Sequence, residues 1–118
     1  MDIETFRDYC LAMKGVREEM TFGSDTVVFK VMGEMLALMP LKTLDFKISL
    51  KNAPKKNQDL RANFPGIQGA FHSSKTHWSM FLMNEGISSK VLKECVDDSY
   101  RLVVAKLTKA LKVELATL

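Results

Sequence analysis

Residues 44 to 51 alternate strictly between apolar and polar side chains, and this pattern constrains the fold more than any other in the chain. The apolar positions are Leu44, Phe46, Ile48 and Leu50, and the polar positions between them are Asp45, Lys47, Ser49 and Lys51. Because successive side chains of a β-strand point to opposite faces, the pattern predicts a strand with one buried face and one wet face. Such strands are typical of antiparallel sheets.

Three further stretches favour β-structure. Residues 26–31 alternate in the same way, and residues 35–41 form an apolar run that follows a tight turn at residues 32–34. Residues 77–83 predict a later strand, and residues 67–76 before it predict a loop or an irregular strand. In the later strand, alternation predicts a core face and an opposite face, formed by Trp78, Met80 and Leu82 and by His77, Ser79 and Phe81 respectively.

Helical periodicity marks both ends of the chain. Residues 2–14 carry apolar side chains at spacings of three and four, which predicts a first helix. A second amphipathic helix is predicted to begin at residue 88 or 89 and to continue as far as Leu111. A short helix is predicted over residues 58–64, after a break at residues 52–57.

A helix, a hairpin-rich strand region and a second helix together indicate a two-layer α+β domain. We expect one domain over residues 1–118, with an antiparallel sheet and with the N- and C-terminal helices packed on one face. The apolar residues of the 44–51 strand should then pack against Leu92, Val96 and Val103. Lys47 and Lys51 should lie exposed on the opposite face of the sheet.

The composition excludes several classes of protein. With 47% hydrophobic and 26% charged residues, the chain is neither disordered nor of low complexity. No stretch approaches the ~20 consecutive apolar residues of a membrane-spanning helix, and no secretory signal is expected. We therefore expect no membrane contact. Cys10 and Cys95 lie far apart in predicted helices, which favours reduced, buried thiols and a cytoplasmic protein.

The net charge of +3 is unevenly distributed. Residues 1–34 carry a net charge of −3, residues 35–84 a net charge of +5 and residues 85–118 a net charge of +1. Residues 35–84 are thus the basic middle of the chain, and they also contain Arg61 and Trp78. A basic segment of this kind suggests a surface that faces an anion. Basic groups with interleaved aromatic rings are typical of nucleic-acid surfaces. The candidate nucleic-acid-binding residues are Lys47, Lys51, Lys55, Lys56, His72, Lys75 and His77.

Signatures of catalysis are mostly absent. The chain has no glycine-rich phosphate loop and no nucleophile elbow, so we expect no enzyme, no cofactor and no catalytic residue. His72 and His77 could share a metal ion, but Lys75 between them would repel a cation and no carboxylate or cysteine lies nearby. We therefore expect no metal site, and hydrogen-bonding surface histidines instead.

Several short motifs resemble the MmcQ/YjbR-like family, and they occur in order across nearly the whole chain. The motifs are Phe29-Lys30-Val31, Met35-Leu36-Ala37-Leu38, Ser49-Leu50-Lys51, Pro54, Phe64-Pro65-Gly66, His72, Lys75, His77-Trp78, Ser99-Tyr100 and Leu102-Val103. The resemblance implies a CyaY-like α+β fold, a twisted antiparallel sheet with helices on one side, and DNA binding. The resemblance also implies that the polar motif of the family corresponds, position by position, to Lys51, Pro54, His72, Lys75, His77 and Trp78.

Two functions from different classes follow from these observations. The first is a non-catalytic nucleic-acid-binding module, with DNA as the expected partner, that uses the basic sheet face and the 51–78 region. The alternative is a protein-interaction or small-ligand-binding adaptor that uses a cleft around His72, Lys75 and His77. In either case we expect a monomer or a weak dimer.

Overall fold

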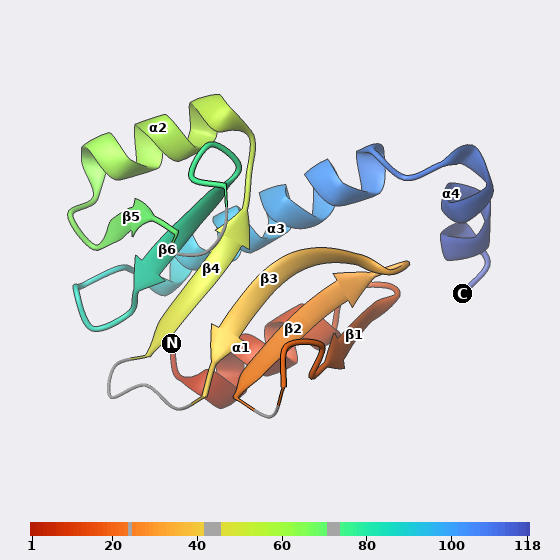
Figure 1. The fold of residues 1–118 in the computed structure, drawn as a ribbon, viewed down its shortest axis with the longest axis horizontal. Helices are drawn as coiled ribbons and strands as arrows, with labels where there is room; N and C mark the ends of the chain where they lie inside the picture. The colour runs from red at the N-terminus through yellow and green to blue at the C-terminus, as the bar shows by residue number, and fades with distance from the viewer. Residues whose placement is uncertain (24, 42–45, 71–73) are drawn as a thin grey trace.

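The chain folds around one six-stranded antiparallel sheet, in the strand order β1-β2-β3-β4-β6-β5 (Figure 1). The structure is a computed structural model, which describes residues 1–23, 25–41, 46–70 and 74–118. The strands are β1 (Val16–Glu19), β2 (Thr26–Val31), β3 (Glu34–Pro40), β4 (Lys47–Lys51), β5 (Ile67–Gly69) and β6 (Trp78–Leu82). The predicted α+β class is confirmed.

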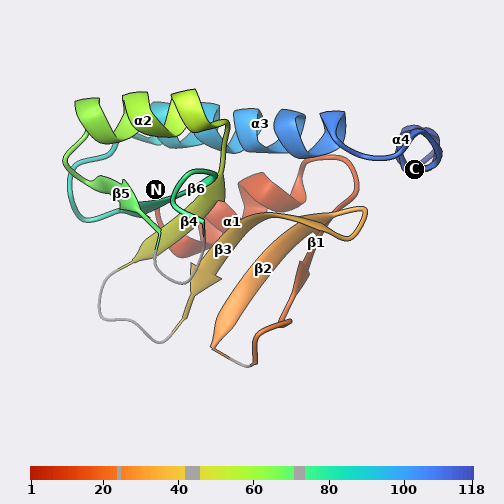
Figure 2. The same cartoon turned by 45° about the horizontal axis from the view of Figure 1, so that its top comes forward.

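Four helices accompany the sheet: α1 (Ile3–Leu11), α2 (Pro54–Asn63), α3 (Ser89–Ala105) and α4 (Lys109–Ala116). Buried side chains of α1, α2 and α3 belong to one hydrophobic cluster with a single face of the sheet. Figure 2 shows α2 and α3 side by side along that face. The N-terminal and C-terminal helices therefore cover one face of the sheet, as the sequence predicted.

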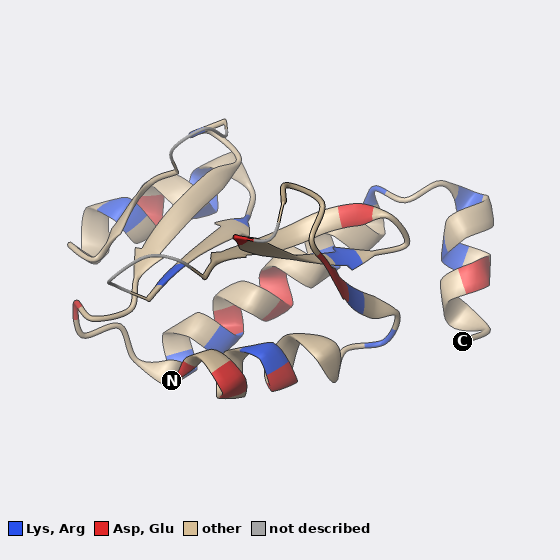
Figure 3. Cartoon of the chain, turned by 60° about the horizontal axis from the view of Figure 1, so that its bottom comes forward, with Lys and Arg blue, Asp and Glu red and all other residues tan. Residues whose placement is uncertain are grey.

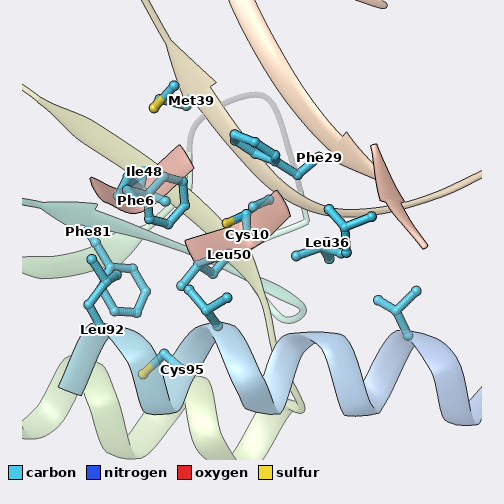
Figure 4. Close-up of a cluster of buried hydrophobic side chains, with 14 of the residues drawn as sticks. Phe6, Cys10, Phe29, Leu36, Met39, Ile48, Leu50, Phe81, Leu92 and Cys95 are labelled. Atoms are coloured by element: carbon cyan, nitrogen blue, oxygen red, sulfur yellow. The ribbon is translucent and has the colours of Figure 1, made fainter. Parts of the chain in front are cut away.

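The hydrophobic core lies between the sheet and α1 and α3 (Figure 4). The Phe6 ring of α1 meets the Phe29 ring edge-on at a centroid distance of 5.6 Å. Ile48 and Leu50 are fully buried in the same cluster, together with Leu92, Val96 and Val103 of α3, so this predicted packing is confirmed. Leu44, which was expected to join them, lies outside the described residues.

The predicted faces of the last strand are wrong. Phe81 lies opposite Ile48 and Ser79 lies opposite Leu50, so both face the core. Trp78 lies opposite Lys51 on the other face of the sheet, yet its side chain is only 7% exposed. The expected burial of Trp78 is therefore confirmed, but on the opposite face. Residues 78–81 are all buried, so alternation within β6 carries no information about its faces.

Two helix boundaries also differ from the sequence-based expectation. α2 begins at Pro54, four residues earlier than predicted, because proline fits the first turn of a helix, where no N–H partner is needed. The C-terminal helix ends at Ala105, and Thr108 then caps a separate helix, α4, by accepting a hydrogen bond from the Leu111 N–H. Strand β1 was not predicted at all.

The break before α4 brings the end of the chain back to the turn after α1. Lys14 Nζ donates to the Ala116 carbonyl at 2.9 Å, and Leu115 is buried. Gly15 has φ of +76°, and a Cβ there would lie 2.5 Å from a methyl carbon of Leu115. The backbone conformation therefore favours glycine at this position, and a larger residue would also force the Leu115 side chain to move.

Candidate functional site

Lys47 and Lys51 lie on the sheet face away from the core, as the alternation predicted. Both are half-buried rather than exposed, which corrects the sequence-based expectation. Lys51 borders a pocket of about 220 Å³ that it shares with Glu34 and with Lys106 at the end of α3. Trp78 and Met80 on the same face are buried, so the centre of this face is apolar and not an open basic surface.

Lys55 and Lys56 lie on α2, on the opposite side of the sheet from Lys47. The Lys55 ammonium pairs with Asp59 at 3.5 Å, and the Lys56 ammonium pairs with Asp98 of α3 at 3.0 Å. The hydrogen bond to Asp98 raises the pKa of Lys56. These two lysines therefore do not join Lys47 on one surface. Figure 3 shows the same scatter of Lys and Arg over several elements.

The remaining predicted residues precede β6. His72 lies outside the described residues. Lys75 is exposed and His77 is half-buried in a turn over residues 74–77, which we call the 74–77 turn. The Trp78 N–H donates to the Ser74 carbonyl at 2.8 Å and closes this turn. The Asn52 N–H donates to the His77 carbonyl at 2.9 Å and joins the turn to the end of β4.

A buried polar network holds the 74–77 turn against α2. Asn57 Nδ2 donates to the carbonyls of Asn52 and Thr76, at 3.1 and 2.9 Å. Ser79 Oγ donates to Asn57 Oδ1 at 2.8 Å. Asn57 is 1% exposed and Ser79 is fully buried, so these hydrogen bonds form away from water, where an unmade one would be costly.

Arg61 completes this network, although the sequence marked it only as part of the basic middle. Its Nε donates to Ser79 Oγ at 3.1 Å, and its Nη2 donates to the carbonyls of Lys75 and Trp78. All three acceptors are uncharged, so they orient the guanidinium without neutralising it. Among the described residues, no carboxylate forms an ion pair with Arg61.

A small pocket opens between α2 and the 74–77 turn. It has a volume of about 170 Å³ and is lined by Pro54, Gln58, Arg61, Lys75 and Thr76, and we call it the α2 pocket. Its lining holds two cations and no carboxylate. The three α2 residues follow one another at spacings of four and three, so they share one face of the helix.

Other chemistry has little support in the described part of the chain. No group of three or more His, Cys, Asp or Glu side chains there could hold a metal ion. Burial raises the pKa of the Cys10 thiol to about 12 and that of the Cys95 thiol to about 11, so neither is a ready nucleophile. No helix in the described ranges is both long enough and apolar enough to cross a bilayer.

A larger and more apolar pocket of about 460 Å³ lies between α1 and the β1 edge of the sheet. Its lining consists of Ile3, Arg7, Glu18, Glu19, Met20, Val27, Met39 and Leu41. Arg7 is the cation in this lining, and its guanidinium pairs with Glu18 of the same lining at 2.5 Å. The positive charge in the pocket is therefore neutralised. None of the predicted site residues lines this pocket.

The strand order, the helices on one face and the anchored 74–77 turn define a class of small α+β proteins with a single antiparallel sheet. The family model for YjbR matches residues 11–102, and the chain belongs to that family. The uncharacterized protein YbdF of Escherichia coli O157:H7 is 33% identical over 107 residues, which are 90% of this chain and 87% of that protein.

Solved structures agree with this assignment. The crystal structure of Deinococcus radiodurans protein DR2400, described with the family-model domain DUF419, has a TM-score of 0.88 and 30% sequence identity. That similarity covers 97% of this chain and 87% of the other. A crystal structure of a protein from Pseudomonas syringae has a TM-score of 0.73 and 26% identity, over 86% of this chain and 98% of that chain.

Proposed function

We propose that this protein is a non-catalytic nucleic-acid-binding module that contacts phosphate groups through the 74–77 turn and the adjoining face of α2. The observation that carries the proposal is the anchoring of this turn. Asn57 and Arg61 fix its backbone from α2, while Lys75 in the turn stays exposed to solvent. A cation on a fixed backbone binds a phosphate with less loss of conformational entropy than one on a free loop.

The pairing of charges supports the same surface. In the described ranges, Lys47, Lys51, Lys75 and Arg61 form no ion pair with a carboxylate, whereas Lys55 and Lys56 do. In the described part of the basic middle these four cations are therefore available to phosphates. Arg61 and Lys75 are the two of them that lie on the proposed surface, because Lys47 and Lys51 lie on the opposite face of the sheet. Because Trp78 is buried, it offers no exposed ring on which a base could stack. We therefore expect the protein to contact the sugar-phosphate backbone of the nucleic acid rather than its bases.

The test is a binding titration with labelled duplex and single-stranded DNA over a series of salt concentrations. For duplex DNA, the logarithm of the affinity should fall with the logarithm of the salt concentration, with a slope of about −0.9 for each phosphate neutralised. Lys75→Gln should weaken binding to all sequences alike and make the slope shallower by about one.

Lys90→Gln is the matched control, because Lys90 is also exposed but lies on α3, outside the α2 pocket. It removes the same charge and should leave the slope unchanged. Absence of binding at low salt for every nucleic acid would overturn the proposal. An equal effect of the two substitutions would overturn the assignment of the surface.

A second candidate function is the protein-interaction or small-ligand adaptor, at a place other than the cleft around His72, Lys75 and His77 that the sequence analysis proposed for it. The apolar pocket between α1 and β1 favours it, because the exposed side chains of Ile3, Met20 and Leu41 line that pocket. Both functions fit a cytoplasmic protein, in which the two buried thiols stay reduced. The CyaY-like character of the fold remains a prediction of the family resemblance.

A further inference from the structure

We propose that the α2 pocket is a binding site for a single phosphate group, held by Arg61 and Lys75. The inference deepens the proposed function and rests on it for the source of the phosphate, which would be a nucleic-acid backbone. A small phosphate ester carries the same group, and the experiment below separates the two sources.

The charge of the pocket is the first argument. Arg61 and Lys75 are both cations, while the other three lining residues are Pro54, Gln58 and Thr76. Elsewhere in the described ranges, Arg7, Lys30, Lys55, Lys56 and Arg101 each pair with a carboxylate. Two cations that share one concave site without a carboxylate repel each other, and a bound anion would relieve that repulsion.

The orientation of Arg61 is the second argument. Its Nε and Nη2 are occupied by Ser79 Oγ and by two backbone carbonyls, whereas Nη1 has no hydrogen-bond partner among the described residues. The guanidinium is thus fixed before a ligand arrives, with one end free to donate. A charged donor that is already immobilised loses little conformational entropy when it binds a phosphate oxygen.

The position of Lys75 is the third argument. Its aliphatic stem lies across Gly69 of β5, where an added Cβ would approach the Cγ and Cδ carbons to 3.1 Å. The backbone carbonyl of the same residue accepts from Arg61. The Arg61 guanidinium is therefore tied directly to the backbone of the residue that carries the second cation. Gln58 and Thr76 add an amide and a hydroxyl group, which can donate to the remaining oxygens of a phosphate.

The experiment is a titration of the isotope-labelled full chain with inorganic phosphate against chloride, at constant pH and ionic strength, followed by NMR. We expect saturable shifts of the Gln58 and Thr76 backbone amides and of the Arg61 Nε–H signal. Shifts that do not saturate, or that spread evenly over the surface lysines, would overturn the proposal.

Two pairs of variants make the test specific. Gln58→Glu places a carboxylate in the pocket and should abolish the saturable shifts. Gln68→Glu makes the same change of charge at an exposed residue of β5, outside the pocket, and should preserve the shifts. Lys75→Gln should raise the dissociation constant for phosphate about tenfold, and Lys90→Gln should leave it unchanged. All four positions are on the surface, so amide spectra of the free variants should show an intact fold.

A parallel titration with a short oligothymidylate separates this proposal from the proposed function. If the phosphate shifts do not saturate and the oligonucleotide binds Gln58→Glu as well as it binds the unmodified chain, the phosphate site is wrong while nucleic-acid binding stands. If inorganic phosphate binds at the pocket and the oligonucleotide does not bind at all, the phosphate site stands and serves a small phosphate ester. Loss of both phosphate and oligonucleotide binding in Gln58→Glu, but not in Gln68→Glu, supports both.

Discussion

Asn57→Ala should destabilise the protein far more than the substitution of an exposed asparagine in the same helix, α2. Asn57 is 1% exposed and makes three hydrogen bonds, to the carbonyls of Asn52 and Thr76 and from the hydroxyl of Ser79. In the alanine variant these three groups lose a partner, and two of them belong to the backbone that positions the 74–77 turn.

The size of the effect follows from the number of bonds and their burial. A hydrogen bond within a protein contributes about 1 kcal/mol, and a buried polar group left without a partner costs about 1–3 kcal/mol. Ser79 Oγ and Thr76 O keep other contacts or lie near solvent, so the penalties will be partial. We expect the free energy of unfolding to fall by about 3 kcal/mol, a large share of the roughly 5–15 kcal/mol of a typical domain.

The assay is equilibrium unfolding in urea, followed by the fluorescence of the single tryptophan. Asn63→Ala is the matched control: its Nδ2 also donates to a backbone carbonyl, that of Asp59, but Asn63 is exposed at the end of α2. It should change stability by no more than about 0.5 kcal/mol. The Trp78 N–H, which closes the 74–77 turn, should exchange with solvent faster in Asn57→Ala.

Equal stability losses in the two asparagine variants would refute this reasoning. That result would mean that the buried network contributes no more than an exposed helix-end contact. Asn57→Ala could instead unfold at a lower urea concentration while the Trp78 N–H still exchanges slowly with solvent. That result would show that the network stabilises α2 without fixing the turn.

Three other substitutions test separate parts of the fold. Trp78→Ala should lower the free energy of unfolding by about 3 kcal/mol or more, and the emission of the native tryptophan should be blue-shifted and insensitive to added oligonucleotide. The hydrogen bond to Asp97 raises the pKa of Tyr9 to about 12, above the ordinary tyrosine value of about 10. The contribution of this bond to the free energy of unfolding is therefore complete below pH 10 and is lost as the pH rises from 10 to 12. Tyr9→Phe should cost about 1 kcal/mol at neutral pH and remove that pH-dependent loss in urea titrations. Gly15→Ala should destabilise more than Gly86→Ala in thermal unfolding, because both glycines have φ of +76° but only Gly15 lies against α4.

The alternation of residues 46–51 predicted β4 correctly because the two faces of that strand differ in burial. Ile48 and Leu50 are fully buried under the helices, while Lys47 and Lys51 keep part of their surface in water. β6 lies beside it in the same sheet and is buried on both sides. Its side chains carry no such contrast, so the faces of Trp78 and Phe81 follow only from their register with β4.

α2 was predicted too short for a related physical reason. The helix buries only Asn57 and Leu60 among its ten residues, so its inward face includes a polar side chain and lacks an apolar stripe. Periodicity of hydrophobic residues cannot mark such a helix. The network that anchors the 74–77 turn begins at Asn57, and the hydrophobic pattern of the sequence therefore gave no sign of it, although Lys75 was already among the candidate residues.

The net charge of a segment counts its cations but does not say which of them are already paired. Residues 35–84 carry a net charge of +5, yet Lys56 is held by Asp98, which is 42 positions further along the chain. Within the described part of the chain, Arg61 has no carboxylate partner, because its acceptors are uncharged carbonyl and hydroxyl oxygens, which a count of charged residues does not reveal. A pattern of basic residues can therefore suggest an anion-facing surface, but it cannot say which cations would belong to that surface. Within the described residues, the fold shows which cations already pair with a carboxylate, and on the surface that we propose Arg61 therefore stands beside Lys75 whereas Lys56 does not.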